Sequence, residues 1–159
     1  MPKIDPVHSP CYCVNLRYAA NSLTKHYDAA LAKVQLTGNQ FFLLRSISEL
    51  GTCNKSELAQ YTRLERTTII RNLEILRKKQ VIEEVPGPTR RNNLIQRTEH
   101  GKTALEQGQM IWEQLQAEVY QTFGAENISV FWNLLDRFEH LFRADRAECN
   151  ADWEKKQTT

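Results

Sequence analysis

The sequence lacks the features that would place the chain in several large classes of protein. No apolar run approaches the roughly 20 residues that a membrane-spanning helix needs. Residues 1–10 contain no apolar segment followed by a small-residue cleavage site. Four cysteines in 159 residues are too sparse for a small domain held together by disulfides. These absences predict a folded cytoplasmic protein with reduced thiols and no contact with membranes.

Motifs for catalysis and cofactor binding are also missing. The sequence contains no glycine-rich phosphate loop, no nucleophile elbow and no paired-histidine metal motif. It is therefore predicted not to be an enzyme and to need no cofactor or metal ion. His8, Cys11 and Cys13 could form part of a zinc site, but Cys-x-Cys is not the usual ligand spacing and no fourth ligand is evident nearby.

Charge is divided unevenly along the chain, although the net charge is only +2. Residues 61–102 hold ten basic and five acidic side chains, a local balance of +5, whereas residues 103–159 hold five basic and ten acidic ones, a balance of −5. A basic middle and an acidic C-terminal region suit a protein that presents one region to a polyanion. Helical surfaces that are charged only for solubility could show a similar composition.

The first half of the chain predicts three helices. Apolar residues at helical spacing indicate the first over residues 11–34. Thr37 is expected to cap a second helix that stops at Gly51. Asn54, with Glu57 three residues later, has the capping-box arrangement that starts a short third helix. The side chains expected to face inward from this third helix are those of Leu58, Ala59 and Tyr61.

A turn at Arg63 and Leu64 is expected to lead into a fourth helix, over residues 65–79. Its apolar residues are spaced by four and three positions and so share one face: Ile69, Leu73 and Leu76. Two short strands, 81–85 and 94–97, are joined by the turn-rich segment PGPTRRNN. Two short helices followed by a hairpin form a winged helix-turn-helix, a unit that reads DNA.

Two further helical segments close the chain. The first is expected from Glu99 to Thr122, followed by a break at 124–127 and a last helix. Both show an apolar seam with coiled-coil spacing. In the first helix the seam consists of Leu105, Gly108, Trp112, Leu115 and Val119. In the last helix it consists of Ile128, Phe131, Leu135, Phe138 and Phe142. Burial against a second subunit is the simplest use for such seams.

The order and spacing of these elements resembles the multiple-antibiotic-resistance regulator (MarR) family. The segments that carry the resemblance are LTGNQFFLLRSI (36–47), SELAQYTRLERTTIIRNLEILRKKQVIEEV (56–85) and RTEHG (97–101), within a likeness that covers roughly residues 11–145. The resemblance implies a mainly α fold with a small β-hairpin wing, and a homodimer formed by the N- and C-terminal helices. The chain is then one domain over 1–159, with 11–50 and 99–149 as dimerisation helices and 52–98 as the DNA-binding lobe.

The resemblance further implies that each recognition helix enters a major groove of palindromic double-stranded DNA. The residues that it places against DNA are Arg66, Thr67, Thr68, Arg71 and Asn72 in the helix, with Arg90 and Arg91 at the wing. Three positions depart from the family pattern. Thr89 replaces an aspartate that braces the wing arginine, Gln80 replaces the glycine that ends the recognition helix, and Arg97 replaces a leucine.

Many members of the family respond to small aromatic acids bound between the dimer helices and the winged unit. Here such a pocket would draw on Tyr18, His26, Phe42, Arg45 and Trp112. Alternatively, Cys13 resembles the reactive cysteine of the organic-hydroperoxide sensors (OhrR type), because Leu16 and the pair Leu36-Thr37 follow at matching distances. A helix N-terminus favours the thiolate that peroxides oxidise. Cys149 of the other subunit could then act as the resolving thiol.

The function predicted from the sequence is a dimeric, DNA-binding transcriptional regulator. It is expected to be a repressor that a chemical signal releases from its operator, most simply a small aromatic or phenolic ligand, with redox sensing through Cys13 as the alternative. Two other functions remain as alternatives. One is a winged helix that binds only proteins, and the other is a thiol peroxidase that uses Cys13. Steep loss of DNA affinity with salt would exclude the first of these two, and a reaction with peroxide that stops after one turnover would exclude the second.

Overall fold

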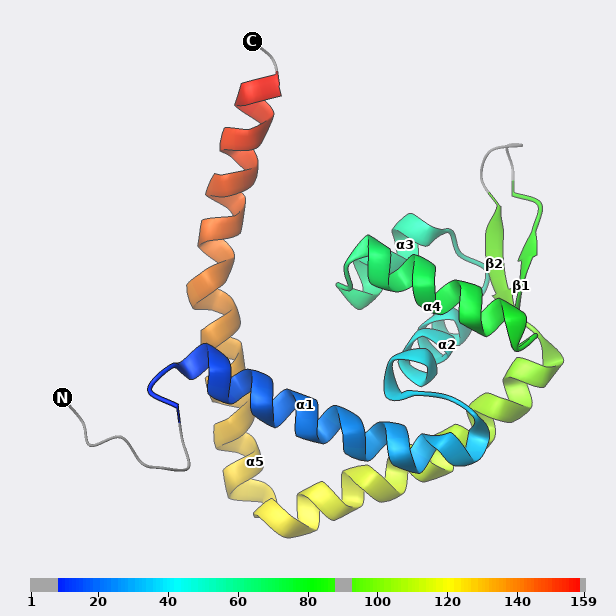
Figure 1. The fold of residues 1–159 in the computed structure, drawn as a ribbon, viewed down its shortest axis with the longest axis horizontal. Coiled ribbons are helices and arrows are strands. Elements are labelled where there is room, and N and C mark those ends of the chain that lie inside the picture. The colour runs from blue at the N-terminus through cyan, green and yellow to red at the C-terminus, as the bar shows by residue number, and fades with distance from the viewer. Residues whose placement is uncertain (1–8, 88–92, 158–159) are drawn as a thin grey trace. The chain divides into compact units, whose positions relative to one another are not determined.

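The structure is a computed structural model that describes residues 9–87 and 93–157, with side chains described as far as Leu141. In chain order its elements are α1 (Tyr12–Leu31), a 3-10 turn η1 (Ala32–Val34), α2 (Gly38–Leu50), α3 (Lys55–Thr62), α4 (Arg66–Lys78), β1 (Ile82–Val85), β2 (Leu94–Arg97) and α5 (Glu99–Gln157) (Figure 1). The mainly helical fold with one hairpin agrees with the fold class predicted from the sequence. No helix in the described ranges is long and apolar enough to cross a membrane.

The chain forms two compact units, Met1–Leu115 and Gln116–Thr159, which are described separately. In the first unit α2 is central and contacts α1, α3, α4 and β2 (Figure 1). Its buried side chains include Phe41, Leu44 and Ile47, which are at most 3% exposed. They form one apolar core together with residues from all the neighbouring elements, among them Leu31, Leu58, Leu76 and Ile95. This core fixes α3, α4 and the hairpin to one scaffold.

The predicted helix caps are confirmed. The Thr37 hydroxyl accepts a hydrogen bond from the Gln40 backbone N–H, and the Gln40 side chain accepts one from the Thr37 backbone N–H. Asn54 and Glu57 form the same reciprocal pair at the start of α3. Gly51, with φ of 74°, ends α2 in a backbone conformation that favours glycine. The chain therefore enters α3 where the sequence predicted.

The expectation for Tyr61 was wrong, and the break expected in the C-terminal helical region is confirmed at Gly124 alone. Tyr61 does not face inward, because its side chain is 49% exposed and its hydroxyl donates to Glu49 instead. The break expected at 124–127 is confined to Gly124, where φ is 74° and ψ is 160°, and helical structure continues on both sides. The first seam of α5 also packs differently from the expectation. Leu105 and Trp112 lie against the core of their own chain, and Gly108 allows the Phe41 ring to approach the helix backbone.

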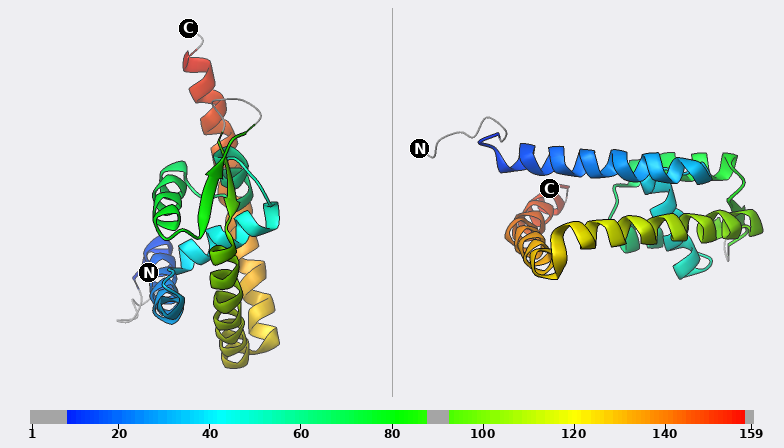
Figure 2. Two further views of the ribbon diagram at one scale, coloured as in Figure 1. Left: turned by 90° about the vertical axis from the view of Figure 1, so that its right-hand side faces the viewer. Right: turned by 90° about the horizontal axis from the view of Figure 1, so that it is seen from below.

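The hairpin pairs β1 with β2 in antiparallel register, with Ile82 opposite Arg97 and Val85 opposite Leu94. Figure 2 shows it projecting from the end of the first unit at which α5 begins. Cys53 extends this small sheet through two backbone hydrogen bonds with Ile95, of 3.0 and 2.7 Å. Its side chain is buried, as expected for a core cysteine. The loop between α2 and α3 is thus attached to the base of the hairpin.

A tight junction joins α4, β1 and α5. Gln80 has φ of 57°, and so adopts the left-handed conformation at the position where the family has glycine. The Thr98 hydroxyl donates to the Gln80 carbonyl at 2.7 Å and accepts from the Gly101 N–H at 3.0 Å. The Thr98 N–H donates to the Val81 carbonyl at 3.1 Å. These bonds hold the end of α4, the first wing strand and the start of α5 together.

Candidate nucleic-acid interface

Helix α4 separates its side chains cleanly into two faces. Ile69, Leu73 and Leu76 are buried on one face. The opposite face carries an exposed row with successive spacings of four, three and four residues, which keeps its members on one side of a helix. The members of this row are Thr67, Arg71, Glu74 and Lys78. We call it the outer row of α4.

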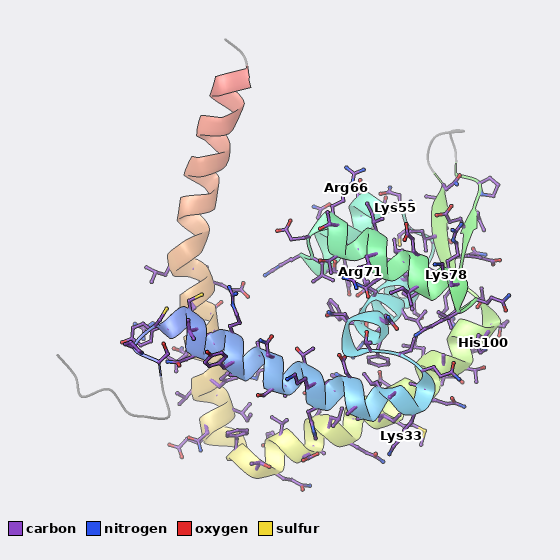
Figure 3. All side chains as sticks on the ribbon, viewed as in Figure 1. Lys33, Lys55, Arg66, Arg71, Lys78 and His100 are labelled. Carbon is purple, nitrogen blue, oxygen red and sulfur yellow. The ribbon has the colours of Figure 1, made fainter. Side chains whose placement is uncertain are left out.

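The structure places the predicted base-facing residues at different positions around α4. Arg66, Thr67 and Arg71 are exposed, whereas Thr68 and Asn72 are half-buried beside the outer row. The Asn72 amide donates to the Thr68 carbonyl at 2.8 Å, so one of its donors is used inside the helix. Figure 3 shows Arg66, Arg71 and Lys78 distributed along α4. A helix surface with arginine, lysine and threonine side chains can bond to phosphates and base edges.

The outer row also includes two residues that the sequence analysis did not place among the site candidates. Glu74 lies three residues after Arg71, and Lys78 four residues after Glu74. The four-three-four spacing that starts at Thr67 would have selected both. Glu74 additionally lines a groove of about 170 Å³ between α4 and β1, together with Ile70, Arg77 and Glu83. The outer row of α4 is therefore not uniformly basic, because it includes the acid Glu74.

The predicted wing residues Arg90 and Arg91, together with Thr89, lie outside the described residues. The part of the hairpin that is described carries acidic side chains with partners of their own. Lys55 at the start of α3 forms an ion pair with Glu84, with 3.7 Å between Nζ and Oε1 (Figure 3). The Gln96 amide donates to Glu83 at 2.8 Å. The ion pair links the hairpin to α3, and the Gln96 hydrogen bond links β2 to β1 within the hairpin.

Two of the predicted ligand residues meet, and they belong to a chain of contacts that runs from α5 to α3. The Arg45 guanidinium lies over the Trp112 ring, 4.8 Å from its centroid, and its Nε donates to Glu49 at 2.9 Å. Glu49 also accepts a hydrogen bond of 2.7 Å from the Tyr61 hydroxyl. We call this the Trp112–Tyr61 relay. It connects the long helix with the first helix of the helix-turn-helix through side chains of α2.

The relay shifts the acidity of two of its members. The hydrogen bond from Tyr61, followed by that from Arg45, holds the pKa of the Glu49 carboxyl below its usual 4.5. The hydrogen bond to Glu49 raises the pKa of the Tyr61 hydroxyl above its usual 10.0. Both shifts favour the same arrangement, an ionised Glu49 and a protonated Tyr61. The relay is therefore complete across the whole neutral range.

Tyr61→Phe should lower the melting temperature slightly, and the loss should depend on pH. A lowered carboxyl pKa gives stability above pH 4.5 that disappears as pH falls through the folded-state pKa. A raised tyrosine pKa gives stability below pH 10.0 that disappears as pH rises through its folded-state value. The melting temperatures of the wild type and Tyr61→Phe should differ by a constant amount between these two pH limits. Outside the limits the two melting temperatures should converge. A difference that did not change with pH would show that Tyr61 acts through packing alone.

The other predicted ligand residues lie on α1 and on α2. Phe42 lies one turn before Arg45 on α2 and is exposed, while Tyr18 and His26 lie on exposed positions of α1. Among the described residues, no hydrogen bond or ring contact joins Tyr18 to Arg45 or Trp112. The single chain therefore brings two residues of the predicted pocket into contact, Arg45 and Trp112.

The cysteines occupy different environments. Cys11 is the N-cap of α1 and Cys13 lies in its first turn, and both are exposed. Burial, with a further contribution from the charge of Glu57, raises the pKa of the Cys53 thiol. Cys149 lies in the part of α5 whose side chains are not described. Within the described residues no cluster of three metal-ligating side chains occurs, and His8 lies outside that range.

Comparison with known proteins decides the family. A winged helix DNA-binding domain model matches residues 36–101. The transcriptional regulator MosR of Mycobacterium tuberculosis, solved in complex with DNA, is 35% identical, with 86% of this chain and 97% of that chain covered and a TM-score of 0.71. The chain belongs to the MarR family. It is thus a MarR-family transcriptional regulator, as the sequence resemblance implied.

Two more distant structures show the same fold. MarR of Escherichia coli, complexed with operator DNA, is 22% identical over 77% of this chain and 89% of that chain, with a TM-score of 0.71. BpsR of Bordetella bronchiseptica, whose DNA binding is regulated by 6-hydroxynicotinic acid, is 20% identical over 86% of this chain and 99% of that chain, with a TM-score of 0.74. No curated protein matches this MarR-family chain.

Proposed function

We propose that this MarR-family protein is a homodimeric repressor that binds a palindromic double-stranded DNA operator through α4. The observation that carries the proposal is the outer row of α4, which is exposed opposite a buried face of Ile69, Leu73 and Leu76. MosR, which is 35% identical to this chain, was solved in complex with DNA and supports the same use of the fold. Residues 52–98 form the DNA-binding lobe, and 11–50 with 99–149 form the dimerisation helices.

The chemistry of the outer row fits a major groove. Arg71 can bond to a guanine through O6 and N7, and Thr67 can bond to a base edge or contact a thymine methyl group. Arg66 and Lys78, nearer the two ends of α4, are suited to phosphate oxygens. Thr68 and Asn72 contribute at the edge of this surface, with the Asn72 amide already donating within the helix. Arg90 and Arg91 remain the proposed wing contacts to DNA.

Dimerisation is proposed because both terminal helices leave apolar side chains exposed. On α1 these are Tyr12, Leu16, Tyr18 and Leu23, and on the C-terminal part of α5 they include Phe123, Val130, Phe131, Trp132 and Leu141. A soluble chain rarely exposes so many large apolar groups unless a partner covers them. A second copy would also place two recognition helices about one DNA turn, roughly 34 Å, apart.

The Arg71→Ala variant tests the DNA-reading surface. Footprinting of the wild type on DNA from upstream of its own gene should reveal a palindrome with half-sites one helical turn apart. Arg71→Ala should lose discrimination at one base pair of each half-site, which costs roughly 1–3 kcal/mol. Arg137→Ala, on the exposed surface of the second unit, provides the matched control and should bind like the wild type. If Arg71→Ala bound the operator with the affinity and base preferences of the wild type, Arg71 would not contact the DNA and the proposed DNA-binding surface would be wrong.

The releasing signal is proposed to be a small aromatic acid bound at Arg45 and Trp112. A carboxylate on the ligand would compete with Glu49 for the guanidinium of Arg45, and its ring would lie against the exposed side of Phe42. Displaced from Arg45, Glu49 would hold Tyr61 less firmly, and α3 would lose one of its attachments to α2. The regulation of BpsR by 6-hydroxynicotinic acid gives a precedent for this class of ligand. Tyr18 and His26 are proposed to complete the pocket.

Calorimetric titration with 2-hydroxybenzoate can test the ligand site. Arg45→Ala should abolish binding, and Glu49→Gln should strengthen it because the competing carboxylate is gone. Ligand at saturation should release the wild type from its operator and leave Arg45→Ala bound. If Glu49→Gln bound the ligand no better than the wild type, displacement of Glu49 would not be part of the mechanism. Such a result would leave the DNA-binding proposal untouched.

A second candidate signal is oxidation of Cys13, favoured by its exposed position in the first turn of α1. A peroxide would transfer one oxygen to the thiolate and leave as an alcohol or water, which gives a sulfenic acid. A thiol such as Cys149 of the partner could then attack the sulfenic sulfur and form a disulfide, with the sulfenic oxygen leaving as water. Peroxide should then release wild-type protein but not Cys13→Ser from DNA, and Cys11→Ser should respond like the wild type. Release of the Cys13→Ser variant by peroxide would exclude Cys13 as the sensor.

A further inference from the structure

Glu74 occupies an unexpected place for an acidic residue. It lies in the outer row of α4, one turn after Arg71 and one turn before Lys78, and its side chain is exposed. A carboxylate in this row would face the polyanion that the proposed function brings to α4. Phosphate groups repel a carboxylate, so an acidic side chain at this position weakens DNA binding unless it meets a hydrogen-bond donor. The donor must come from the DNA or from the protein itself.

The described residues of the protein do not supply that donor. Within the described part of the chain, no hydrogen bond or ion pair engages the Glu74 carboxylate, although Arg71, Arg77 and Lys78 lie within one turn of it. Other acids of the winged unit have clear structural partners. Glu57 completes the cap of α3, Glu83 accepts from Gln96, and Glu84 pairs with Lys55. Among the described residues, Glu74 is thus an exposed acid of the outer row whose carboxylate is engaged by no hydrogen bond or ion pair.

We propose that Glu74 determines specificity by accepting a hydrogen bond from the 4-amino group of a cytosine in the major groove. An ionised carboxylate can only accept hydrogen bonds. Guanine presents two acceptors in this groove and thymine presents one, so both repel it. Adenine presents its amino group beside the N7 acceptor, whereas cytosine presents its amino group alone. Cytosine is thus the base that complements Glu74, and this inference rests on the proposed use of α4 for reading DNA.

Helix geometry relates this cytosine to the guanine proposed for Arg71. Three residues advance an α-helix by about 4.5 Å along its axis. Successive base pairs along one strand are about 3.4 Å apart. The base pairs read by Arg71 and Glu74 should therefore be adjacent or separated by one pair. Each half-site is expected to contain a guanine and a cytosine at that spacing, with Glu74 excluding thymine and guanine at its own position.

A panel of operators with every single base-pair change in one half-site provides the test, with binding measured for the wild type, Glu74→Ala and Glu74→Gln. The wild type should prefer cytosine at one position by roughly 5- to 150-fold. Glu74→Ala should lose that preference and bind unrelated DNA more tightly, because one negative charge is removed. Glu74→Gln should shift the preference toward adenine, since a glutamine amide can bond to both N6 and N7 of that base.

Glu83→Gln is the matched control, because it removes the same charge from an exposed residue of the same groove. It should leave the base preferences of the wild type unchanged. If Glu74→Ala kept the wild-type profile, or if Glu83→Gln altered it in the same way as Glu74→Gln, cytosine reading by Glu74 would be refuted while the DNA-binding function stood. If the wild type bound every operator equally or none at all, the proposed function itself would fail and this inference with it.

Discussion

Replacing Gly101 with alanine is expected to destabilise the folded protein by about 3 kcal/mol or more. A Cβ at this position would lie 2.0 Å from the Val81 carbonyl oxygen and 2.9 Å from its carbon. These are backbone atoms of Val81, and Val81 cannot move aside easily. Val81 is buried, its N–H donates to Leu76, and its carbonyl accepts from Thr98. The added methyl group must therefore separate the start of α5 from the first wing strand.

Urea denaturation of Gly101→Ala beside Gly38→Ala measures this effect. Gly38 begins α2, and a Cβ there would make only ordinary contacts, 3.4 Å from Asp28 Oδ1 and 3.5 Å from Tyr27 Cβ. Because alanine restricts the unfolded chain more than glycine does, Gly38→Ala should be neutral or stabilising by up to about 1 kcal/mol. Equal stability of the two variants would mean that the junction of α4, β1 and α5 is looser than the structure indicates.

A second large effect is expected when a charge is placed in the proposed dimer interface. Phe131 is 49% exposed in the single chain and packs beside Trp132, with ring centroids 5.7 Å apart. If a second copy covers this surface, Phe131→Asp would bury an unpaired carboxylate, at a cost of several kcal/mol. The dimer dissociation constant should rise by about 100-fold or more, since every 1.4 kcal/mol is a factor of ten.

Light scattering at micromolar concentration distinguishes a dimer from a chain of 18.5 kDa. The wild type should have twice that mass, and Phe131→Asp should have the monomer mass and lose operator binding. Asn133→Asp adds the same charge to an exposed polar position of the same helix and should remain dimeric. A monomeric wild type, or a dimeric Phe131→Asp, would remove this surface from the interface and leave the exposed residues of α1 as the alternative.

Local chemistry made much of the fold predictable. The capping residues Thr37 and Asn54 determine where α2 and α3 begin, and the four-three spacing of Ile69, Leu73 and Leu76 determines which face of α4 is buried. Such features depend on neighbours within one or two helical turns. Tyr61 could not be placed correctly in this way, because an eight-residue helix has too few apolar positions to define a single face. Its partner Glu49 belongs to the preceding helix.

The parts of the site that depend on distant residues could not be read from the sequence. The pairing of Arg45 with Glu49 follows an i, i+4 spacing, but the positions of Trp112 and Tyr61 around this pair require the folded core. The same holds for Gly101, whose importance comes from its contact with Val81. The four-three-four spacing of α4 also selects Glu74, but its negative charge does not fit the general expectation that DNA-facing residues are basic. Arg90 and Arg91 lie outside the described residues and stay predictions.

The central claim, that α4 of a dimer binds a specific DNA operator, is tested most directly by a salt series. Fluorescence anisotropy of the wild type on labelled DNA from upstream of its own gene, and on a scrambled fragment, should show preference for the upstream fragment. Affinity should fall by about 10³-fold or more between roughly 50 and 200 mM salt, because several phosphates are neutralised. Affinity that was independent of salt, or equal for the two fragments, would contradict the account.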